Sequence, residues 1–295
     1  MKRLISNLIA ALAISAPLVA QPQLASGSPS RSGSGSGAHT PGWINSGPSN
    51  SGLLLASGGS ARSSVAATAK TPQSALKQWW DFQAEVGGTW RALWDANTQI
   101  PMRIFGSGIA VPGSVADPAI AELHARRTLS KHLALLAPGA TASDFVMVSN
   151  EVHRGIRSIG FTQFYLGMPV LGGQLSFRYK ADRLVVMGSE ALPRVKTGTV
   201  ENSEKLSNSK YQDIAAKWIR EDGAQRTAYG AVSGLQVLPI IAAVGAKYHT
   251  VVAVTIDSTA PIGKWQVYLD AKTGERVAKE QVLRFGSGTV EFHVP

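Results

Sequence analysis

Histidine and acidic side chains are the groups in this sequence that metal or acid–base chemistry would need, and their spacing decides which chemistry they support. Zinc hydrolysis uses two ligands on one helix face, commonly as His-Glu-x-x-His, and this motif is absent. His124 and His132 fall on one predicted helix, but eight residues separate them by about 12 Å along its axis. Glu151 and His153 point to the same side of a predicted strand. Two residues exposed on the surface explain this pattern more simply than a metal site does.

Other catalytic motifs are absent from the sequence as well. A nucleophilic serine would be expected on a Gly-x-Ser-x-Gly turn, and none occurs. No Gly-x-x-x-x-Gly-Lys-Ser/Thr phosphate loop occurs, and the glycines of residues 27–59 lack a flanking strand and helix. Carboxylates that are distant in sequence can still meet in space, but the composition gives no reason to expect it. The motifs therefore predict a chain that is not an enzyme and has no cofactor or metal.

Charge and cysteine content limit the partners and the compartment. The sequence has 295 residues, a formal net charge of +10 and no cysteine. Half of that charge lies in residues 1–70, and the rest of the chain is mildly basic without a cationic run that alternates with aromatic residues. This distribution argues against nucleic-acid binding. Without disulfides the protein must be stabilised by its apolar core, for which the roughly 220 residues after the leader are sufficient.

The N-terminal part of the sequence predicts export. In residues 1–20, Lys2 and Arg3 precede a mostly apolar run, as in a secretory signal peptide. An uncleaved membrane anchor is the alternative, but the run is shorter than the roughly 20 residues that a spanning helix needs. Residues 21–70 are rich in Gly, Ser and Pro and predict a disordered linker. We therefore expect a secreted or periplasmic protein with no membrane attachment after signal removal.

Residues 157–193 organise the first folded unit. Apolar and polar residues alternate along this stretch, which predicts three antiparallel strands joined by turns at residues 167–173 and 180–182. A helix is predicted over residues 118–137, with Asp117 as its N-cap. Packed on the apolar face of the strands, this helix would close one core. The other predicted elements are a helix at residues 71–86 and strands at residues 90–94, 102–105 and 144–152.

A second unit has the same order of elements. It begins with an amphipathic helix over residues 211–219, which ends at Gly223. Four strands follow, at residues 235–244, 248–256, 264–269 and 275–283. The predicted segments of the whole chain are a signal peptide (1–20), a linker (21–70), a first module (71–195), a second linker (196–208), a second domain (209–285) and a C-terminal strand or tail (286–295).

Several motifs resemble a known family. The first unit resembles the fungalysin/thermolysin propeptide (FTP) module, and the second resembles the PepSY domain that follows this module in precursors of secreted metallopeptidases. The motif residues of the first unit are Gln163, Gly167, Pro169, Val170, Gly172 and Gly173. Those of the second unit are Trp265, Asp270 and Gly274.

The resemblance implies an α+β fold of two cystatin-like units, each a helix packed on an antiparallel β-sheet. It further implies a non-catalytic protein that assists the folding of an extracellular zinc metallopeptidase, in cis or in trans, and inhibits it. Two other hypotheses stay open. One is a stand-alone extracellular or envelope binding module with the same fold, and the other is the N-terminal part of a metallopeptidase precursor whose catalytic domain lies beyond this sequence.

Overall fold

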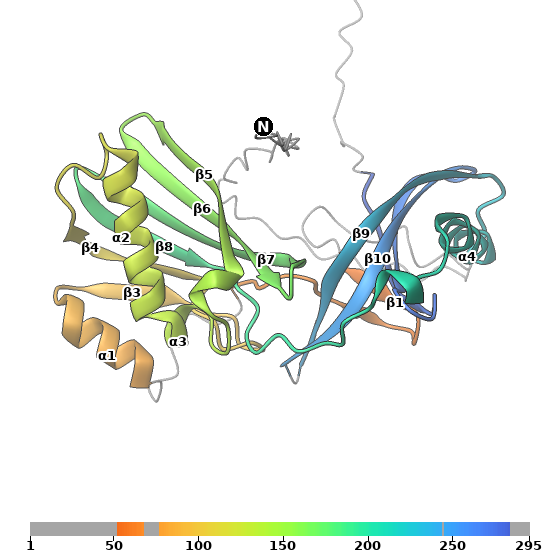
Figure 1. Ribbon diagram of the computed structural model, residues 1–295, viewed down its shortest axis with the longest axis horizontal. Coiled ribbons are helices and arrows are strands. Elements are labelled where there is room, and N and C mark those ends of the chain that lie inside the picture. The colour runs from red at the N-terminus through yellow and green to blue at the C-terminus, as the bar shows by residue number, and fades with distance from the viewer. Residues whose placement is uncertain (1–51, 68–76, 244, 284–295) are drawn as a thin grey trace, which may run out of the picture. The chain divides into compact units, whose positions relative to one another are not determined.

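The computed structural model describes residues 52–67, 77–243 and 245–283, which belong to one unit of the chain. These residues form an α+β fold, as predicted, with helices packed on mostly antiparallel strands (Figure 1). The predicted signal peptide, most of the first linker, the start of the predicted helix at 71–86 and the C-terminal tail lie outside the described residues.

The first half of the fold, residues 77–189, is a helical layer on an antiparallel sheet. Its elements are α1 (Lys77–Val86), β3 (Trp90–Leu93), β4 (Arg103–Ala110), α2 (Pro118–Lys131), α3 (Leu133–Leu136), a 3₁₀ turn (Ala142–Asp144), β5 (Phe145–His153), β6 (Ile156–Tyr165), β7 (Met168–Lys180) and β8 (Arg183–Ser189). Adjacent strands follow the order β5-β6-β7-β8-β4-β3. The three strands predicted over residues 157–193 are thus confirmed as β6, β7 and β8.

Helix α2 begins where the sequence predicts because its first turn is capped. The Asp117 carboxylate accepts a hydrogen bond of 2.8 Å from a first-turn backbone N–H, and Pro118 occupies a position where no donor is needed. The single helix predicted over residues 118–137 is instead divided at His132 into α2 and α3. The His132 ring packs edge-on against Phe82 of α1, with 5.1 Å between ring centroids, so the division coincides with the contact to α1.

One apolar core lies between these helices and the sheet, and Figure 1 shows α2 lying across that face. Along β7, Leu175, Phe177 and Tyr179 are buried in this core, whereas the residues between them face away from it, as the alternation predicted. Other large buried members are Trp79, Phe82, Trp90, Trp94, Ile104, Leu129, Leu136, Ile159 and Phe161. The sheet therefore has one face in the core and one face turned away from the helices.

Two-residue turns join the three central strands. Leu166 and Gly167 connect β6 to β7 with φ values of 49° and 78°, and Ala181 and Asp182 connect β7 to β8 with φ values of 48° and 51°. Paired positive φ angles match the twist of a tight hairpin. The turn predicted at residues 167–173 is therefore too long, because β7 begins directly after Gly167.

The second half of the fold, residues 208–281, repeats the helix-and-sheet arrangement. Its elements are α4 (Asn208–Glu221), β9 (Thr227–Ala242), β10 (Gly245–Thr259), β11 (Ile262–Asp270) and β12 (Arg276–Gln281). The four strands pair in chain order and are antiparallel, which confirms the predicted strands, although β9 starts eight residues earlier than the prediction.

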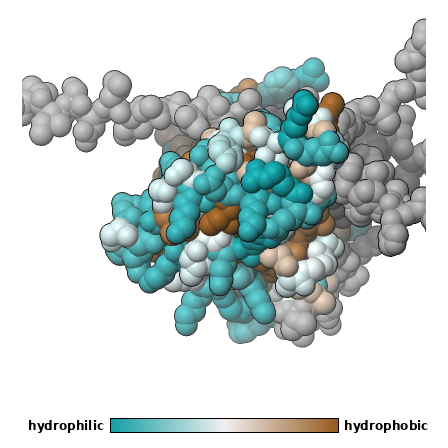
Figure 2. Space-filling model, turned by 90° about the vertical axis from the view of Figure 1, so that its right-hand side faces the viewer, coloured by the Kyte–Doolittle hydropathy of each residue, from teal (hydrophilic) through white to brown (hydrophobic). Residues whose placement is uncertain are grey.

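Helix α4 covers one face of the second sheet through the apolar stripe that its spacing predicted. Tyr211, Trp218 and Ile219 are buried against Val254 and other strand residues. The Tyr211 hydroxyl donates a 2.6 Å hydrogen bond to a backbone carbonyl of the turn after β11, which satisfies its buried polar atom. The molecular face seen in Figure 2, on the side of α4, is mainly hydrophilic.

Residues 52–67, here called the strap, are ordered, so the prediction of a disordered linker is wrong for this segment. Strand β1 (Leu53–Leu55) pairs with β12, and β2 (Ser60–Ala61) folds back on β1. The Leu53 side chain is fully buried. A run of three leucines between Gly- and Ser-rich neighbours is too short to predict a strand by itself, and it becomes ordered because an existing strand offers it an edge.

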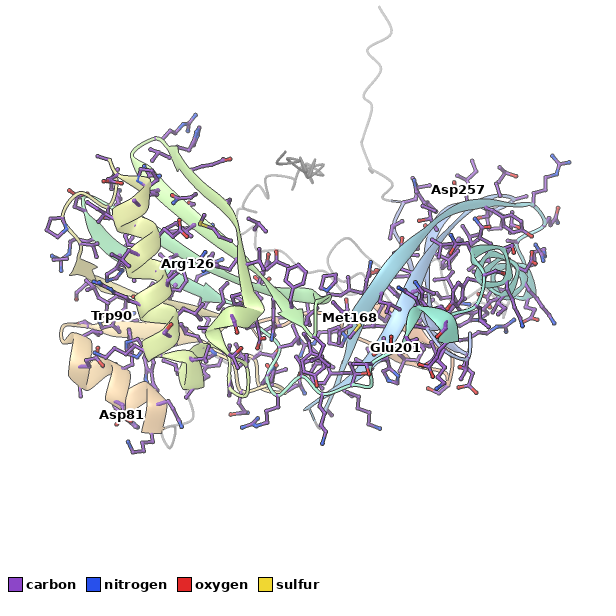
Figure 3. All side chains as sticks on the ribbon, in the orientation of Figure 1. Asp81, Trp90, Arg126, Met168, Glu201 and Asp257 are labelled. Atoms are coloured by element: carbon purple, nitrogen blue, oxygen red, sulfur yellow. The ribbon has the colours of Figure 1, made fainter. Side chains whose placement is uncertain are left out.

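The two halves are joined at one point of a continuous strand order, β2-β1-β12-β11-β10-β9-β7-β8-β4-β3, from which β5 and β6 branch at β7. Val170 of β7 pairs in parallel with Val237 of β9. Both belong to a junction cluster of buried residues: Val65, Ile100, Met168 (labelled in Figure 3), Val170, Leu192, Val237 and Ile241. The strap contributes Val65, so it takes part in the contact between the halves.

Candidate functional site

The described residues contain no set of side chains arranged for metal binding. They hold no group of three or more His, Asp or Glu residues close enough together to bind an ion. His124 instead lies 3.1 Å from the buried hydroxyl of Tyr179, and burial lowers the pKa of this imidazole. His132 packs on α1, and Glu151 and His153 are exposed on β5.

Most motif residues of the first unit lie at or beside the junction cluster, whereas Gly167 lies in the turn before β7. The buried amide of Gln163 donates to the Leu192 carbonyl (3.0 Å) and accepts from the Leu192 N–H (2.7 Å). It therefore satisfies both backbone groups of a residue that has no strand partner there. Val170 forms the bridge to β9, and Pro169 lies beside it at the start of β7.

Gly172 and Gly173 are required by close approaches, not by a turn. A Cβ atom on Gly172, which has φ of 72°, would lie 2.6 Å from the Ser63 carbonyl oxygen of the strap. A Cβ atom on Gly173 would lie 2.7 Å from the side-chain oxygen of Gln163. By contrast, a Cβ atom on Gly167 would meet nothing within 4 Å, so the turn itself needs only the positive φ.

The motif residues of the second unit lie apart from the junction and stabilise the second core. Trp265 is buried under α4. The Asp270 carboxylate accepts hydrogen bonds from the backbone N–H groups of Lys272 (2.9 Å) and Thr273 (2.8 Å), which fixes the turn after β11. A side chain at Gly274, with φ of 74°, would clash with apolar side chains packed against α4.

A buried ion pair that the sequence did not predict ties the strap to the first half. Arg62 donates to the fully buried carboxylate of Asp95 at 2.7 Å, and the Ala66 N–H donates to the same oxygen at 2.9 Å. Burial alone would raise the pKa of Asp95, but the hydrogen bonds from Arg62, Ala66 and Thr98 together hold it below its usual value. On its other side, the Arg62 backbone exchanges hydrogen bonds with Ile241 of β9.

The face of the first sheet that is turned away from the core, here called the open face, has no described helix on it. Strand register places one row of side chains across it: Arg91, Phe105, Val186, Arg178, Ser158 and Glu151. The next row contains Leu93, Arg103, Gly188, Ser176, Gly160 and Ser149. Residues directly opposite each other in paired strands point to the same face. The two rows are two residues apart along each strand, so both lie on this face.

The sequence predicts that one face of the sheet is exposed to solvent, but it does not predict which residues of other strands lie on that face. Alternation along β7 placed Arg178 on it, whereas Arg91 and Phe105 lie far away in sequence and join it only through register. A single sequence gives alternation within a strand but not the pairing between strands.

A cavity of about 260 Å³ lies beside Trp94, Thr98, Leu135 and Arg194. The indole N–H of Trp94 and the hydroxyl of Thr98 are buried without a hydrogen-bond partner. Because those two atoms are almost inaccessible, the cavity does not present them to a ligand.

No helix among the described residues is long and apolar enough to cross a membrane.

Comparisons with known proteins give little further information. No protein-family model matches the sequence. No curated protein matches it. Among solved structures, the chain is similar to the C-terminal domain of YpeB from Bacillus megaterium, with 10% sequence identity and a TM-score of 0.30, over 62% of this chain and 73% of that one. A similarity this distant supports no conclusion about function.

Proposed function

We propose that this chain is an exported, propeptide-like binding module that inhibits an extracellular zinc metallopeptidase and assists its folding, and that it is not itself an enzyme. Support comes from the FTP-like and PepSY-like motifs at residues 163–173 and 265–274. The motif residues have structural roles, at the junction cluster and under α4.

The observation that carries the proposal is the open face of the first sheet. A non-catalytic module must engage its partner through a surface, and here six strands present a row of side chains that no helix covers. A module that binds a folding intermediate more tightly than the unfolded chain lowers the free energy of that intermediate, as a folding assistant must.

The test is to add the full chain to zinc metallopeptidases that the same cells export. We expect slower hydrolysis of a protein substrate, or faster recovery of activity when the denatured peptidase is refolded with the chain. An unrelated exported protein of similar size and net charge is the control. No change in either rate with any of these peptidases would contradict the proposal and favour a stand-alone binding module.

A second assay tests the absence of catalysis. The purified chain, incubated with zinc and an unfolded protein substrate, should release no peptides. Peptide release that a chelator abolishes would contradict the proposal.

A further inference from the structure

The open face carries three arginines whose charge no described group neutralises. Arg91, Arg103 and Arg178 are exposed, and none has an ion pair or a side-chain hydrogen bond in the described structure. Some guanidinium groups elsewhere are paired, for example Arg62 with Asp95 and Arg126 (labelled in Figure 3) with Glu122 at 2.8 Å. Exposed guanidinium groups elsewhere, such as that of Arg127, are also unpaired in the described structure, and this face differs in holding three of them together.

Two further cations on the open face add to its positive charge. Lys180 and Arg183 lie opposite each other at the ends of β7 and β8, and the Arg183 guanidinium donates only to the uncharged carbonyl oxygens of Ser107 and Gly108. The carboxylates on the face are Glu151, at its far edge on β5, and Glu190, which accepts a hydrogen bond from Gln174. Several cations on one sheet surface attract an anionic partner and accelerate its binding.

The three arginines surround an apolar centre. Phe105, which is 36% exposed, and Val186 lie between Arg91 and Arg178 in the same row. Three strand spacings separate the two arginines, which is roughly 14 Å. An extended chain advances roughly 7 Å every two residues, so carboxylates four residues apart could reach both while the side chain between them contacts Phe105.

From this arrangement we infer that the open face binds an acidic, extended segment of another protein, with apolar residues between its carboxylates. The inference goes beyond the proposed function, because it names the surface and the charge of the ligand and holds whether or not the partner is a peptidase. Single-stranded nucleic acid is less suited to the face, since such binding relies on several stacked aromatics, and its two central rows offer one, Phe105.

The probe is a fluorescent peptide of about twelve residues with the repeat Glu-Ser-Val-Ser, which in an extended chain places glutamates four residues apart with a valine between them on the same side and is long enough to span the two arginines. Its binding to the full chain is measured by fluorescence anisotropy. We expect saturable binding that weakens as the salt concentration rises, and at least about tenfold weaker binding for the variant R91Q/R103Q/R178Q, because each lost contact to a charged group contributes to affinity. The same peptide with lysine in place of glutamate should not bind.

A matched variant, R127Q/K210Q/K217Q, removes the same charge from exposed positions on α2 and α4 and should bind the acidic peptide like the unaltered chain. The charge-reversed variant R91E/R103E/R178E should instead bind the lysine peptide. Equal weakening by both neutral variants, or the same affinity for the acidic and lysine peptides, would overturn the inference. So would tighter binding of an oligothymidine of similar length that depends on the same three arginines. Unfolding midpoints of all variants show that they are folded.

Discussion

The two sheets of this protein share one architecture but differ in how many of their faces are buried. The first sheet is covered by α1, α2 and α3 on one face, and its other face is open. The second sheet is covered by α4 on one face and buries a further cluster on the other: Leu53, Leu238, Val251, Ala253, Tyr268 and Ala278. A helix-and-sheet unit thus leaves a surface free for a partner only where no other segment covers it.

Both faces of the second sheet are buried because side chains of the strap and of β7 pack on the face opposite α4. Leu53 and Leu55 of β1 and Leu171 of β7 pack on the face of the second sheet opposite α4. In consequence Val251, Val252, Ala253 and Val254 are all buried, whereas buried and exposed residues alternate along β7. The second sheet therefore has both faces buried, whereas the first sheet has one face that no described helix covers.

Lys279 of the second half and the arginines of the open face also differ in burial and in pairing. In the second half, Lys279 is buried, forms an ion pair with Asp222 and lies 4.3 Å from the centre of the Trp218 ring. On the open face of the first half, the arginines are exposed and unpaired within the described structure. Lys279 therefore stabilises the fold, whereas the arginines on the open face remain available to a ligand.

The largest expected effect comes from detaching the strap. Asp95→Ala leaves Arg62 and the Ala66 N–H without their buried acceptor and should lower the free energy of unfolding by about 3–5 kcal/mol. Urea denaturation measures this loss, and trypsin should then cleave the strap at Arg62. Asp270→Ala, which removes only an exposed turn acceptor, should cost about 1 kcal/mol. Equal losses for the two variants would refute the role of the strap.

Next in size is the effect of filling the space between β7 and the strap. Gly172→Val adds a side chain at positive φ and against the Ser63 carbonyl, so we expect a loss of about 2–4 kcal/mol in the free energy of unfolding. Gly167→Ala has the same backbone strain without the clash and should cost about 1–2 kcal/mol. If Gly172→Val were no worse than Gly167→Ala in urea denaturation, the strap would not pack there.

The buried cation of the second half predicts a pH dependence. Burial lowers the pKa of Lys279 to about 8 from its usual 10.5, so above pH 8 the folded chain releases a proton that the unfolded chain still holds. The free energy of unfolding should therefore rise by about 1–2 kcal/mol between pH 7.5 and 9.5. Lys279→Met should abolish this rise, and the exposed Lys264→Met should retain it. A rise that persists in Lys279→Met would show that another group causes it.

The smallest effect is expected on the open face. The variant R91Q/R103Q/R178Q removes no ion pair or side-chain hydrogen bond within the described structure and should change the free energy of unfolding by less than about 0.5 kcal/mol. Thermal and urea unfolding measure this directly. A large loss would mean that these side chains stabilise the fold and would weaken the contrast between the two sheets.

Local signals in the sequence predicted most helices and strands, whereas long-range contacts determine the ordered strap and the residues that meet on the open face. The cap at Asp117, the stripe on α4 and the alternation along β7 depend on neighbouring residues, and all three are observed. The ordered strap was missed because Leu53 is buried only by strands more than a hundred residues away. The roles of Gly172 and of the row from Arg91 to Arg178 depend on strand pairing, which one sequence does not encode locally.

We propose that this chain binds an exported partner through the open face of its first sheet. The most direct measurement is the concentration of chain that halves the activity of an exported zinc metallopeptidase from the same cells, compared between the unaltered chain and the variants R91Q/R103Q/R178Q and R127Q/K210Q/K217Q. We expect inhibition by the unaltered chain and by R127Q/K210Q/K217Q, and at least about tenfold weaker inhibition by R91Q/R103Q/R178Q. Equal inhibition by all three would contradict the assigned surface, and no inhibition by any of them would contradict the inhibitory function.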